Sequence, residues 1–325
     1  MVAIDPSGNS SKTRRCKMAP FPSPTSKWHS TSYASISPTR TELSAIGKTV
    51  LITGGGTGIG AETARSFAAA GASRIALLGR RKQPLLDVKA SIESKFPGVE
   101  VLAASTDVTK KDQVDTAFAD FVGGGKIDVL VSNAGIMGPP ESVEDADEHT
   151  FIAAIQQHIQ GSLFVSQAFL RHAAPNAIAV NVSSSAAHLN FAPVFASYGI
   201  AKLAAFRLWD SVGYSHPDLS IYHIQPGVVD TDINTVVGGI SALGQEDHGK
   251  QMNNRRSGIY EANSDLVSLP ASFMVWLASS ESRFLKGKYL WANWDVDELK
   301  ARSKELQGST QLNIGLVGYP FENVQ

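Results

Sequence analysis

Short apolar runs alternate with longer amphipathic segments along most of the chain. Runs rich in β-branched and aliphatic residues predict seven strands, at 49–52, 74–78, 99–103, 127–132, 177–182, 219–225 and 287–291. Apolar residues at helical spacing predict helices between them, the clearest at 61–68, 84–95, 148–171 and 266–279. This alternation predicts a single-domain α/β fold, in which a doubly wound, mostly parallel sheet has helices on both faces. Ligands of such sheets bind at the carboxyl ends of the strands.

A glycine-rich turn connects the first strand to the first helix. Residues 47–60 read GKTVLITGGGTGIG, and such a turn directs main-chain N–H groups and the positive end of the helix dipole at one point, where a phosphate can bind. Gly54 permits the turn, Gly58 lets the backbone approach a pyrophosphate, and Gly60 allows the helix to pack closely on the strand. An ordinary flexible loop is the alternative, but the flanking strand and helix favour a nucleotide site. The turn residues that we expect at this site are Gly54, Thr57, Gly58, Ile59 and Gly60.

The composition is that of an ordinary globular chain. Of its 325 residues, 43% are apolar and 18% are charged, which suits a folded core. The net charge of −1 gives no indication of nucleic-acid or membrane-surface binding, and no apolar run approaches the ~20 residues of a membrane-spanning helix. The one cysteine, Cys16, excludes an internal disulfide and fits a reducing compartment, so we expect a cytoplasmic protein.

The beginning of the chain differs from the rest. Residues 1–45 are rich in Ser, Thr and Pro and start with a basic, acid-poor stretch. This composition predicts a partly disordered extension. A mitochondrial presequence is the alternative, with Met18 as an alternative start, although the prolines at 20, 22 and 24 would break an amphipathic helix. The arm at 28–43 carries apolar and aromatic residues and is expected to pack on the domain surface, and we assign it no function.

Five motifs, in one order, connect the chain to a known family. The turn at 53–60 has the spacing TGxxxGxG, and four further motifs follow it. They are Asp-Val at 107–108, Asn-Ala-Gly at 133–135, a serine followed by Tyr-x-x-x-Lys at 198–202, and Pro-Gly at 226–227. Together they resemble the short-chain dehydrogenase/reductase family over about residues 47–232. The resemblance implies a Rossmann fold that binds a nicotinamide dinucleotide.

The residues after the second strand decide which dinucleotide is expected. An NAD site places an acidic residue about 20 positions past the glycines, where it holds the ribose hydroxyls. This chain has Arg80 and Arg81 there instead, and two guanidinium groups could grip a 2′-phosphate. A solvated basic turn is the alternative. The sequence therefore predicts NADP(H), although Thr57 stands where many NADP-using relatives carry a basic residue.

The resemblance also implies further cofactor contacts. Asp107 and Val108 match the pair that holds the adenine ring, although Asp107 could equally cap the next helix. The family's Asn-Ala-Gly motif supports the central strands and closes the cofactor cleft, and its residues here are Asn133, Ala134 and Gly135. The residues implied near the nicotinamide ring and its carboxamide are Pro226, Gly227, Val229 and Thr231.

Tyr198 and Lys202 carry the predicted chemistry. They lie four residues apart in a segment of helical character and therefore share one face. The Lys202 ammonium, with the positive nicotinamide, would lower the pKa of Tyr198 from its usual ~10, so that the phenol could exchange a proton with a substrate oxygen. A hydroxyl from elsewhere should hold that oxygen. Family spacing assigns this role to Ser185, thirteen residues before the tyrosine, rather than to Ser183 or Ser184. It also gives Lys202 a second role, on the nicotinamide ribose.

His158 is the clearest departure from the family pattern. The family carries an asparagine three residues before a glycine on this helix, and alignment on Gly161 places His158 there. In the family, that asparagine acts mainly through its main-chain carbonyl, which holds a water in a proton relay. His158 could keep that carbonyl or add an imidazole that titrates near neutrality. A histidine that packs or reaches solvent is the plain alternative.

Beyond residue 232 the chain has fewer features in common with the family. The segment at 233–263 falls where the family places its substrate lid. The extension at 293–325, with a helical stretch at 296–307, departs from the family's usual end and could cover the pocket or serve an interface. Its layout looks like that of fungal members, many of which act in natural-product pathways. The expected pocket wall comprises Ile136, Met137, His188, Asn190, Phe191 and Phe195.

These inferences predict an NADP(H)-dependent oxidoreductase without a metal ion. We expect hydride transfer between nicotinamide and a carbonyl or secondary alcohol of a small, cyclic or natural-product substrate, with Tyr198 as general acid/base. Two rival hypotheses are a non-redox enzyme, such as a cyclase or dehydratase, and a nucleotide-sensing regulator. Both usually tolerate loss of the Ser, Tyr or Lys, which are all present, and only the exchange at His158 favours them. The family commonly forms homodimers or homotetramers through the helices that carry His158 and Tyr198.

Overall fold

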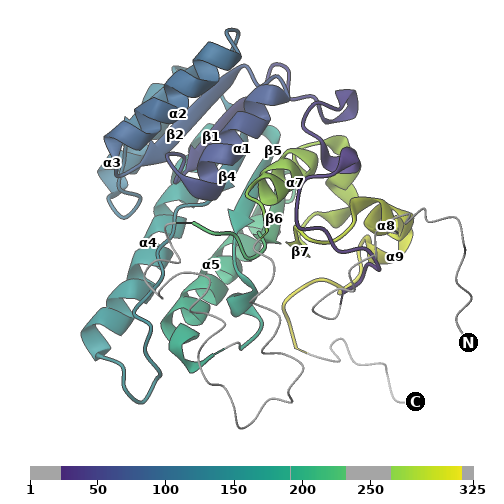
Figure 1. Cartoon of the computed structure of the whole chain (residues 1–325). Helices are drawn as coiled ribbons and strands as arrows, with labels where there is room; N and C mark the ends of the chain where they lie inside the picture. Colours follow the sequence, from purple (N-terminus) through teal and green to yellow (C-terminus); the bar gives the residue numbers. More distant parts are fainter. Residues whose placement is uncertain (1–22, 191, 232–264, 317–325) are drawn as a thin grey trace, which may run out of the picture.

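Seven parallel strands form the centre of the molecule (Figure 1). The computed structural model describes residues 23–190, 192–231 and 265–316. The strands are β1 (Thr49–Thr53), β2 (Arg74–Gly79), β3 (Glu100–Ser105), β4 (Ile127–Ser132), β5 (Ala173–Val182), β6 (Ser220–Gln225) and β7 (Tyr289–Trp291). Their order is β3-β2-β1-β4-β5-β6-β7, and each neighbouring pair is parallel. The predicted single-domain doubly wound fold is confirmed, and the order reverses between β1 and β4, where ligands of such sheets bind.

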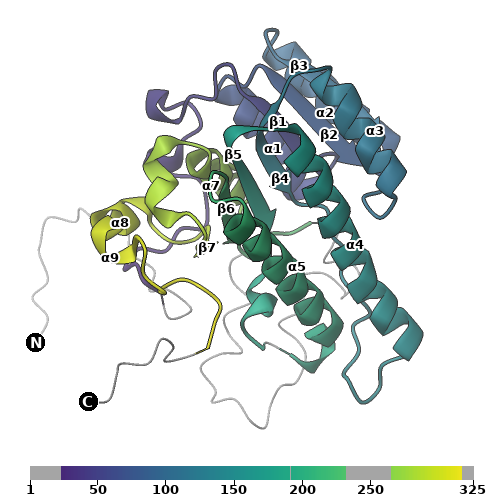
Figure 2. The same cartoon turned by 180° about the vertical axis from the view of Figure 1, so that it is seen from behind.

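Helices cover both faces of this sheet (Figures 1 and 2). One face is covered by α1 (Gly58–Ala69), α2 (Lys82–Lys95) and α7 (Ser268–Leu277). The other is covered by α3 (Lys111–Val122), α4 (Glu148–His172) and α5 (Ala196–Ser215). The long helix α4 begins where the Asp147 carboxylate accepts the N–H of Thr150 at 2.9 Å, which satisfies one of the free donors of its first turn.

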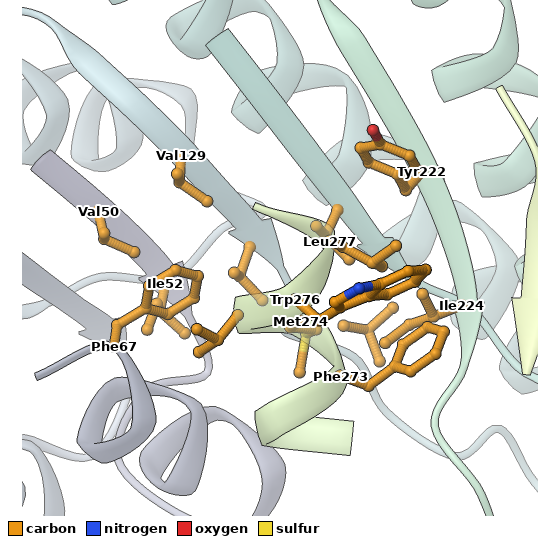
Figure 3. Close-up of a cluster of buried hydrophobic side chains, with 14 of the residues drawn as sticks. Val50, Ile52, Phe67, Val129, Tyr222, Ile224, Phe273, Met274, Trp276 and Leu277 are labelled. Atoms are coloured by element: carbon orange, nitrogen blue, oxygen red, sulfur yellow. The ribbon is translucent and has the colours of Figure 1, made fainter. Parts of the chain in front are cut away.

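Side chains that alternate along the strands produce two separate apolar cores. Val50 and Ile52 belong to the core beneath α1 and α7, whereas Leu51 between them belongs to the opposite one. In the first core, side chains of β1, β4 and β6 meet Phe67 of α1 and Trp276 of α7 (Figure 3). Because the strands are buried on both faces, they read in the sequence as continuous apolar runs.

The N-terminal arm, residues 23–46, packs against the domain. Its short helices η1 (Ala34–Ile36) and η2 (Thr41–Leu43) place the side chains of Ile36 and Leu43 in the first core. The arm, dark purple in Figure 1, runs beside α7 toward the C-terminal helices. The segment predicted to pack on the domain surface thus contributes to its core. Residues 1–22, with Cys16 and Met18, lie outside the described residues.

The C-terminal extension forms two short helices where the sequence predicts one. The first, α8 (Val296–Ala301), begins at Asp295, whose carboxylate accepts the N–H of Glu298 at 2.9 Å. The second, α9 (Ser303–Leu306), follows Arg302, whose N–H donates to the carbonyl of Leu299, three residues back, and so closes the first helix. The predicted lid at 233–263 lies outside the described residues. Within the described ranges, no helix has the length and apolar character needed to cross a membrane.

Candidate active site

The glycine turn after β1 forms a cradle with no room for side chains. Gly54 and Gly58 have φ angles of +69° and +53°, in the region that favours glycine. A Cβ at Gly54 would lie 2.7 Å from Nδ2 of Asn133, and a Cβ at Gly60 would collide with the carbonyl oxygen of Gly54. Because α1 begins at Gly58, the N–H groups of its first turn, which have no partner within the helix, point toward this cradle.

Asn133 and Ala134 fasten the glycine turn to the end of β4. The main-chain N–H groups of both residues donate to the hydroxyl of Thr53, at 2.9 and 3.0 Å. The Asn133 side chain also donates to the carbonyl oxygen of Thr53 at 3.0 Å. These bonds hold the ends of β1 and β4 together at the point where the strand order reverses.

Arg80 and Arg81 lie at the carboxyl end of β2, beside the same turn. Both side chains are exposed, and Nη2 of Arg81 donates to the hydroxyl of Thr57 at 3.2 Å. The guanidinium group of Arg81 therefore lies beside Thr57, the position at which many NADP-using relatives carry a basic residue. Arg81 and Thr57 are therefore neighbours in space, although 24 positions separate them in the sequence.

Asp107 does not cap the helix that follows it. Its Oδ1 accepts the N–H and the hydroxyl of Thr109, at 2.9 and 2.8 Å, whereas the N-cap of α3 is Lys110. The Thr109 N–H is the main cause of a lowered pKa at Asp107. The capping alternative is therefore wrong, because this carboxylate closes its own turn. The next residue, Val108, contacts α4: a Cβ at Gly161 would lie 3.0 Å from its Cγ2.

Lys202 lies beside Gly135 and Tyr198, near the carboxyl ends of β4 and β5. They lie one turn apart on α5, with Nζ of Lys202 5.6 Å from the centre of the Tyr198 ring. The ammonium donates to the carbonyl oxygen of Val182, the last residue of β5, at 3.0 Å. A Cβ at Gly135 would lie 3.4 Å from Nζ of Lys202 and 3.1 Å from Cε1 of His158. The Asn-Ala-Gly and Tyr-x-x-x-Lys motifs, far apart in the sequence, therefore lie next to each other, with His158 beside them.

Burial sets the protonation of this pair. It raises the pKa of Tyr198 to about 12, and the interaction with the Ser184 side chain acts in the opposite direction. It lowers the pKa of Lys202 to about 8. The side chains by themselves therefore do not produce the expected lowering of the tyrosine pKa, because desolvation of the phenolate dominates. At neutral pH the phenol is protonated and most of the amine is charged.

Ser184 is the serine whose side chain interacts with Tyr198. Its Oγ accepts the N–H of Ala186 at 3.3 Å, and a hydroxyl that accepts in this way keeps its proton for a second bond. Ser185 begins the short helix η3 (Ser185–Ala187), and its N–H donates to Oε1 of Gln225 at 2.9 Å. A count back from Tyr198 cannot distinguish adjacent serines, because the path of the turn decides which hydroxyl faces the tyrosine. The role of Ser185 stays a prediction.

Two further residues that the sequence did not single out hold the serine turn. Gln225 is the last residue of β6, and its side chain accepts the N–H of Ser185. Tyr289 is the first residue of β7, and its hydroxyl donates to the carbonyl oxygen of Ser184 at 2.6 Å. Both side chains are buried. The signal available for Gln225 was its place at the end of a predicted strand, directly before Pro-Gly; for Tyr289 it was a phenol in the last predicted strand.

His158 is buried beside the tyrosine. Its ring lies edge-on to that of Tyr198, with 6.1 Å between the ring centres. Nε2 lies 2.8 Å from the carbonyl oxygen of Ile136, and we assign the proton to Nε2 from this bond. Burial, followed by the charge of Lys202, lowers the pKa of His158 to about 4. Of the alternatives for this residue, titration near neutrality and exposure to solvent are wrong, because the apolar surroundings keep the imidazole neutral.

The loop after β6 returns to the glycine turn. It begins with Pro226 and passes Gly227, whose φ is +97°, before Val229. Its described part ends at Thr231, which lies against the glycine turn: a Cβ at Gly58 would be 3.0 Å from Cγ2 of Thr231. The Pro-Gly motif therefore leads from the sheet to the cradle.

Comparison with known proteins identifies the family. The family model for short chain dehydrogenases matches residues 48–238, more than half of the chain. A short chain dehydrogenase/reductase from Claviceps purpurea is 31% identical over 302 residues, covering 91% of this chain and 95% of that protein. The short chain dehydrogenase/reductase AacuD from Aspergillus aculeatus is 31% identical over 307 residues, covering 93% and 99%. The chain belongs to the short-chain dehydrogenase/reductase family of oxidoreductases and is similar to fungal members.

A solved structure shares the fold. A short chain dehydrogenase from Burkholderia cenocepacia, determined in complex with NADP, matches with a TM-score of 0.64 and 24% identity, covering 78% of this chain and 99% of that one. About a fifth of this chain therefore lies outside the match, whereas the two fungal relatives match it over more than nine tenths of its length.

Proposed function

We propose that this protein is an NADP(H)-dependent oxidoreductase that interconverts a carbonyl and a secondary alcohol. The observation that carries the proposal is that the Lys202 ammonium lies beside Gly135 and 5.6 Å from the centre of the Tyr198 ring, while the Ser184 side chain interacts with the Tyr198 phenol. A positioned proton donor, a hydroxyl and a buried cation suit proton exchange with an oxygen, which binding of a nucleotide alone does not require.

The residues at the carboxyl ends of β1, β2 and β4, where sheets of this class have their binding crevice, fit a nicotinamide dinucleotide. The cradle at Gly54 and Gly60 excludes side chains and would admit a pyrophosphate at the start of α1. Arg80 and Arg81 would hold a 2′-phosphate through charge-assisted hydrogen bonds. When bound, the cofactor supplies or accepts the hydride. The other residues that would contact it, by the family's motifs, are Thr57, Gly58, Ile59, Asp107, Val108, Asn133, Ala134, Gly135, Tyr198, Lys202, Pro226, Gly227, Val229 and Thr231.

Ser184, Tyr198 and Lys202 have different roles at the substrate oxygen. In the reductive direction negative charge gathers on that oxygen, and the hydroxyls of Ser184 and Tyr198 both donate to it. The O–H bond of Tyr198 then breaks and an O–H bond of the alcohol forms, which leaves a phenolate. The Lys202 ammonium stabilises this phenolate. Because the pKa of Tyr198 is about 12, the phenol holds its proton at neutral pH and can donate it in the reductive direction.

Aromatic side chains beside the serine turn support a cyclic substrate. His188 follows η3 directly, and its ring packs edge-on against Tyr289 and Trp291. The Trp291 indole donates to Nε2 of His188 at 3.2 Å. His188 is exposed at this turn, with the buried rings of Tyr289 and Trp291 behind it, and a ring held in this way can contact a flat substrate ring. We therefore propose a small cyclic or natural-product carbonyl compound as substrate.

A cofactor assay separates this function from its rivals. NADPH and the protein are incubated with a panel of ketones and quinones, and absorbance at the nicotinamide band is followed. We expect the absorbance of NADPH to fall in the presence of at least one cyclic ketone or quinone. Product formation without a net change in NADPH would identify a non-redox enzyme, and tight NADPH binding without any product would identify a regulator.

The arginine pair should set the cofactor preference. In Arg80→Asp and Arg81→Asp, a carboxylate replaces a group that would bind the 2′-phosphate, and we expect KM for NADPH to rise roughly 10- to 100-fold, since a hydrogen bond to a charged group contributes about 1.5–3 kcal/mol. KM for NADH should fall or stay unchanged. Arg207→Asp, on the exposed face of α5, gives the same charge change away from the crevice. An unaltered NADPH:NADH ratio in both variants would contradict the NADP(H) assignment.

Separate serine variants test which hydroxyl holds the substrate oxygen. We expect Ser184→Ala to lower kcat by roughly 10²-fold, because removing one donor to a developing oxyanion has an effect of about that size. Ser185→Ala should have a smaller effect, since the contact of Ser185 with Gln225 is made by its main chain. Steady-state kinetics of both variants with the same ketone provide the measurement. A larger loss of kcat in Ser185→Ala than in Ser184→Ala would support Ser185, the residue assigned by its spacing from Tyr198.

A further inference from the structure

The carboxylate of Asp265 joins three segments that are far apart in the sequence. Asp265 is only 8% exposed and lies just before α7. Its Oδ2 accepts the N–H of Val228 at 2.9 Å, and its own N–H donates to the carbonyl oxygen of Val228 at 2.7 Å. The side chains of Asn293 and Ser30 also hydrogen-bond this carboxylate. One buried charge thus connects the loop after β6 to the C-terminal extension and to the N-terminal arm.

The shape of that loop depends on Asp265. Gly227 has a φ of +97°, and a Cβ there would lie 2.5 Å from Oδ2 of Asp265, so the carboxylate fills the space beside the glycine. A few residues further on, Thr231 lies against Gly58 of the cradle. Because the chain between Gly227 and Thr231 is short, a shift at its anchored end would displace the end that faces the cradle.

The two side-chain donors are held in place by pairing between the arm and the extension. The N–H of His29 donates to the carbonyl oxygen of Asn293 at 2.8 Å, and the Asn293 amide donates to the carbonyl oxygen of His29 at 2.9 Å. The N–H of Leu266 donates to the carbonyl oxygen of Ser30 at 2.8 Å. Ser30 and Asn293 therefore approach the carboxylate from a fixed backbone.

The Asp265 carboxylate is buried, and hydrogen bonds from three donors offset part of the cost of burying it. Burial raises the pKa of Asp265, and the bonds from Asn293, Val228 and Ser30 oppose this change. Hydrogen bonds to an ionised acceptor are roughly twice as strong as neutral ones. Three donors from three segments therefore fix the loop more rigidly than a single neutral bond would.

We propose that Asp265, with Ser30 and Asn293, is a positioning residue that holds the Gly227 and Val228 backbone in the shape needed to bind the nicotinamide end of the cofactor. The N-terminal arm is thereby part of the working enzyme, although it lies outside the residues that the family model matches. The proposal rests on the proposed function, since it places the dinucleotide along the loop from Gly227 to Thr231.

The test compares Asp265→Asn with Glu298→Gln in the full-length protein. Asparagine keeps the size of the side chain but turns an N–H group toward one of the three donors. We expect Kd for NADPH, measured by tryptophan fluorescence, to rise roughly tenfold, and hydrogen exchange of the peptide covering 226–231 to become faster without ligand. Ser30→Ala removes one donor and introduces no new polar group. It should raise Kd for NADPH and speed hydrogen exchange of residues 226–231, but less than Asp265→Asn does.

Glu298→Gln is the matched control. Glu298 accepts the N–H and hydroxyl of Ser26 at 2.6 and 2.8 Å and the N–H of Lys27 at 3.1 Å, so the variant loosens the same arm at a distance from the loop. We expect faster exchange near residues 23–27 with Kd for NADPH unchanged. An equal rise of Kd in both variants, or no rise in Asp265→Asn, would overturn the inference. A wild-type protein that binds no nicotinamide dinucleotide would contradict the proposed function itself, and with it this inference.

Discussion

Tyr198→Phe should lower turnover by about 10²- to 10⁴-fold, the contribution of a positioned acid/base group, while NADPH binding stays nearly unchanged. The phenol is the group from which we expect the substrate oxygen to receive its proton, and phenylalanine keeps the ring but offers no proton. Because the ring still fills the space next to His158 and Lys202, the crevice should keep its shape. Single-turnover oxidation of bound NADPH with a ketone substrate measures the chemical step directly.

The matched control for this variant lies on the same helix. Tyr214 is 90% exposed near the end of α5, so Tyr214→Phe makes the same chemical change far from the crevice. We expect that variant to keep wild-type rates. A Tyr198→Phe protein that binds NADPH and turns over at the wild-type rate would remove the mechanism, whereas one that fails to bind NADPH would point to a structural role.

Lys202→Met should lower the reductive kcat/KM by roughly 10²- to 10³-fold at pH 7, because the developing charge loses its cation. The pKa of Lys202 is about 8, lowered by burial, so the amine is charged below that pH and neutral above it. The wild-type kcat/KM should therefore fall as the pH rises through about 8, since this parameter follows the ionisation of the free enzyme. The residual kcat/KM of Lys202→Met should not fall as the pH rises through about 8.

Stability and cofactor affinity distinguish a chemical from a structural effect at this position. Methionine fills a similar volume, but it leaves the carbonyl of Val182 without the donor that Lys202 provides. Lys202→Gln offers a neutral amide to that carbonyl, although its side chain is one bond shorter. If Lys202→Gln recovers the folding stability but not the rate, the charge is the active element. Equal recovery of both would contradict the electrostatic role.

The fold could be predicted because its signals are local and repeated. Each strand is buried on both faces, so it appears as an apolar run, and each helix shows its own spacing. Boundaries were less certain where packing sets them: β5 begins at Ala173 rather than 177, and the tail helix breaks at Arg302. The start of β5 depends on the pairing of Ala173 with Ile127 of β4, which is distant along the chain, and the tail helix is closed by the bond from Arg302 to Leu299.

The part of the candidate site that depends only on the spacing of residues along a helix could be predicted from the sequence. Tyr198 and Lys202 share a face because a helix repeats every 3.6 residues, and the structure places them together. Which serine faces the phenol was not accessible in this way, since Ser184 and Ser185 differ only in the path of a turn. The protonation of His158 was equally inaccessible, because its pKa depends on burial and on the charge of Lys202.

The order of residues by itself determined the doubly wound class, the glycine cradle, the family and the tyrosine–lysine pair, because each follows from side-chain periodicity or from a motif within a few positions. Only the tertiary structure decided that Arg81 reaches Thr57, that Asp107 closes its own turn and that the N-terminal arm meets Asp265. The contacts of Arg81 and Asp265 join groups that are far apart in the sequence and meet only once the chain has folded, whereas the contact of Asp107 depends on the path of its own turn.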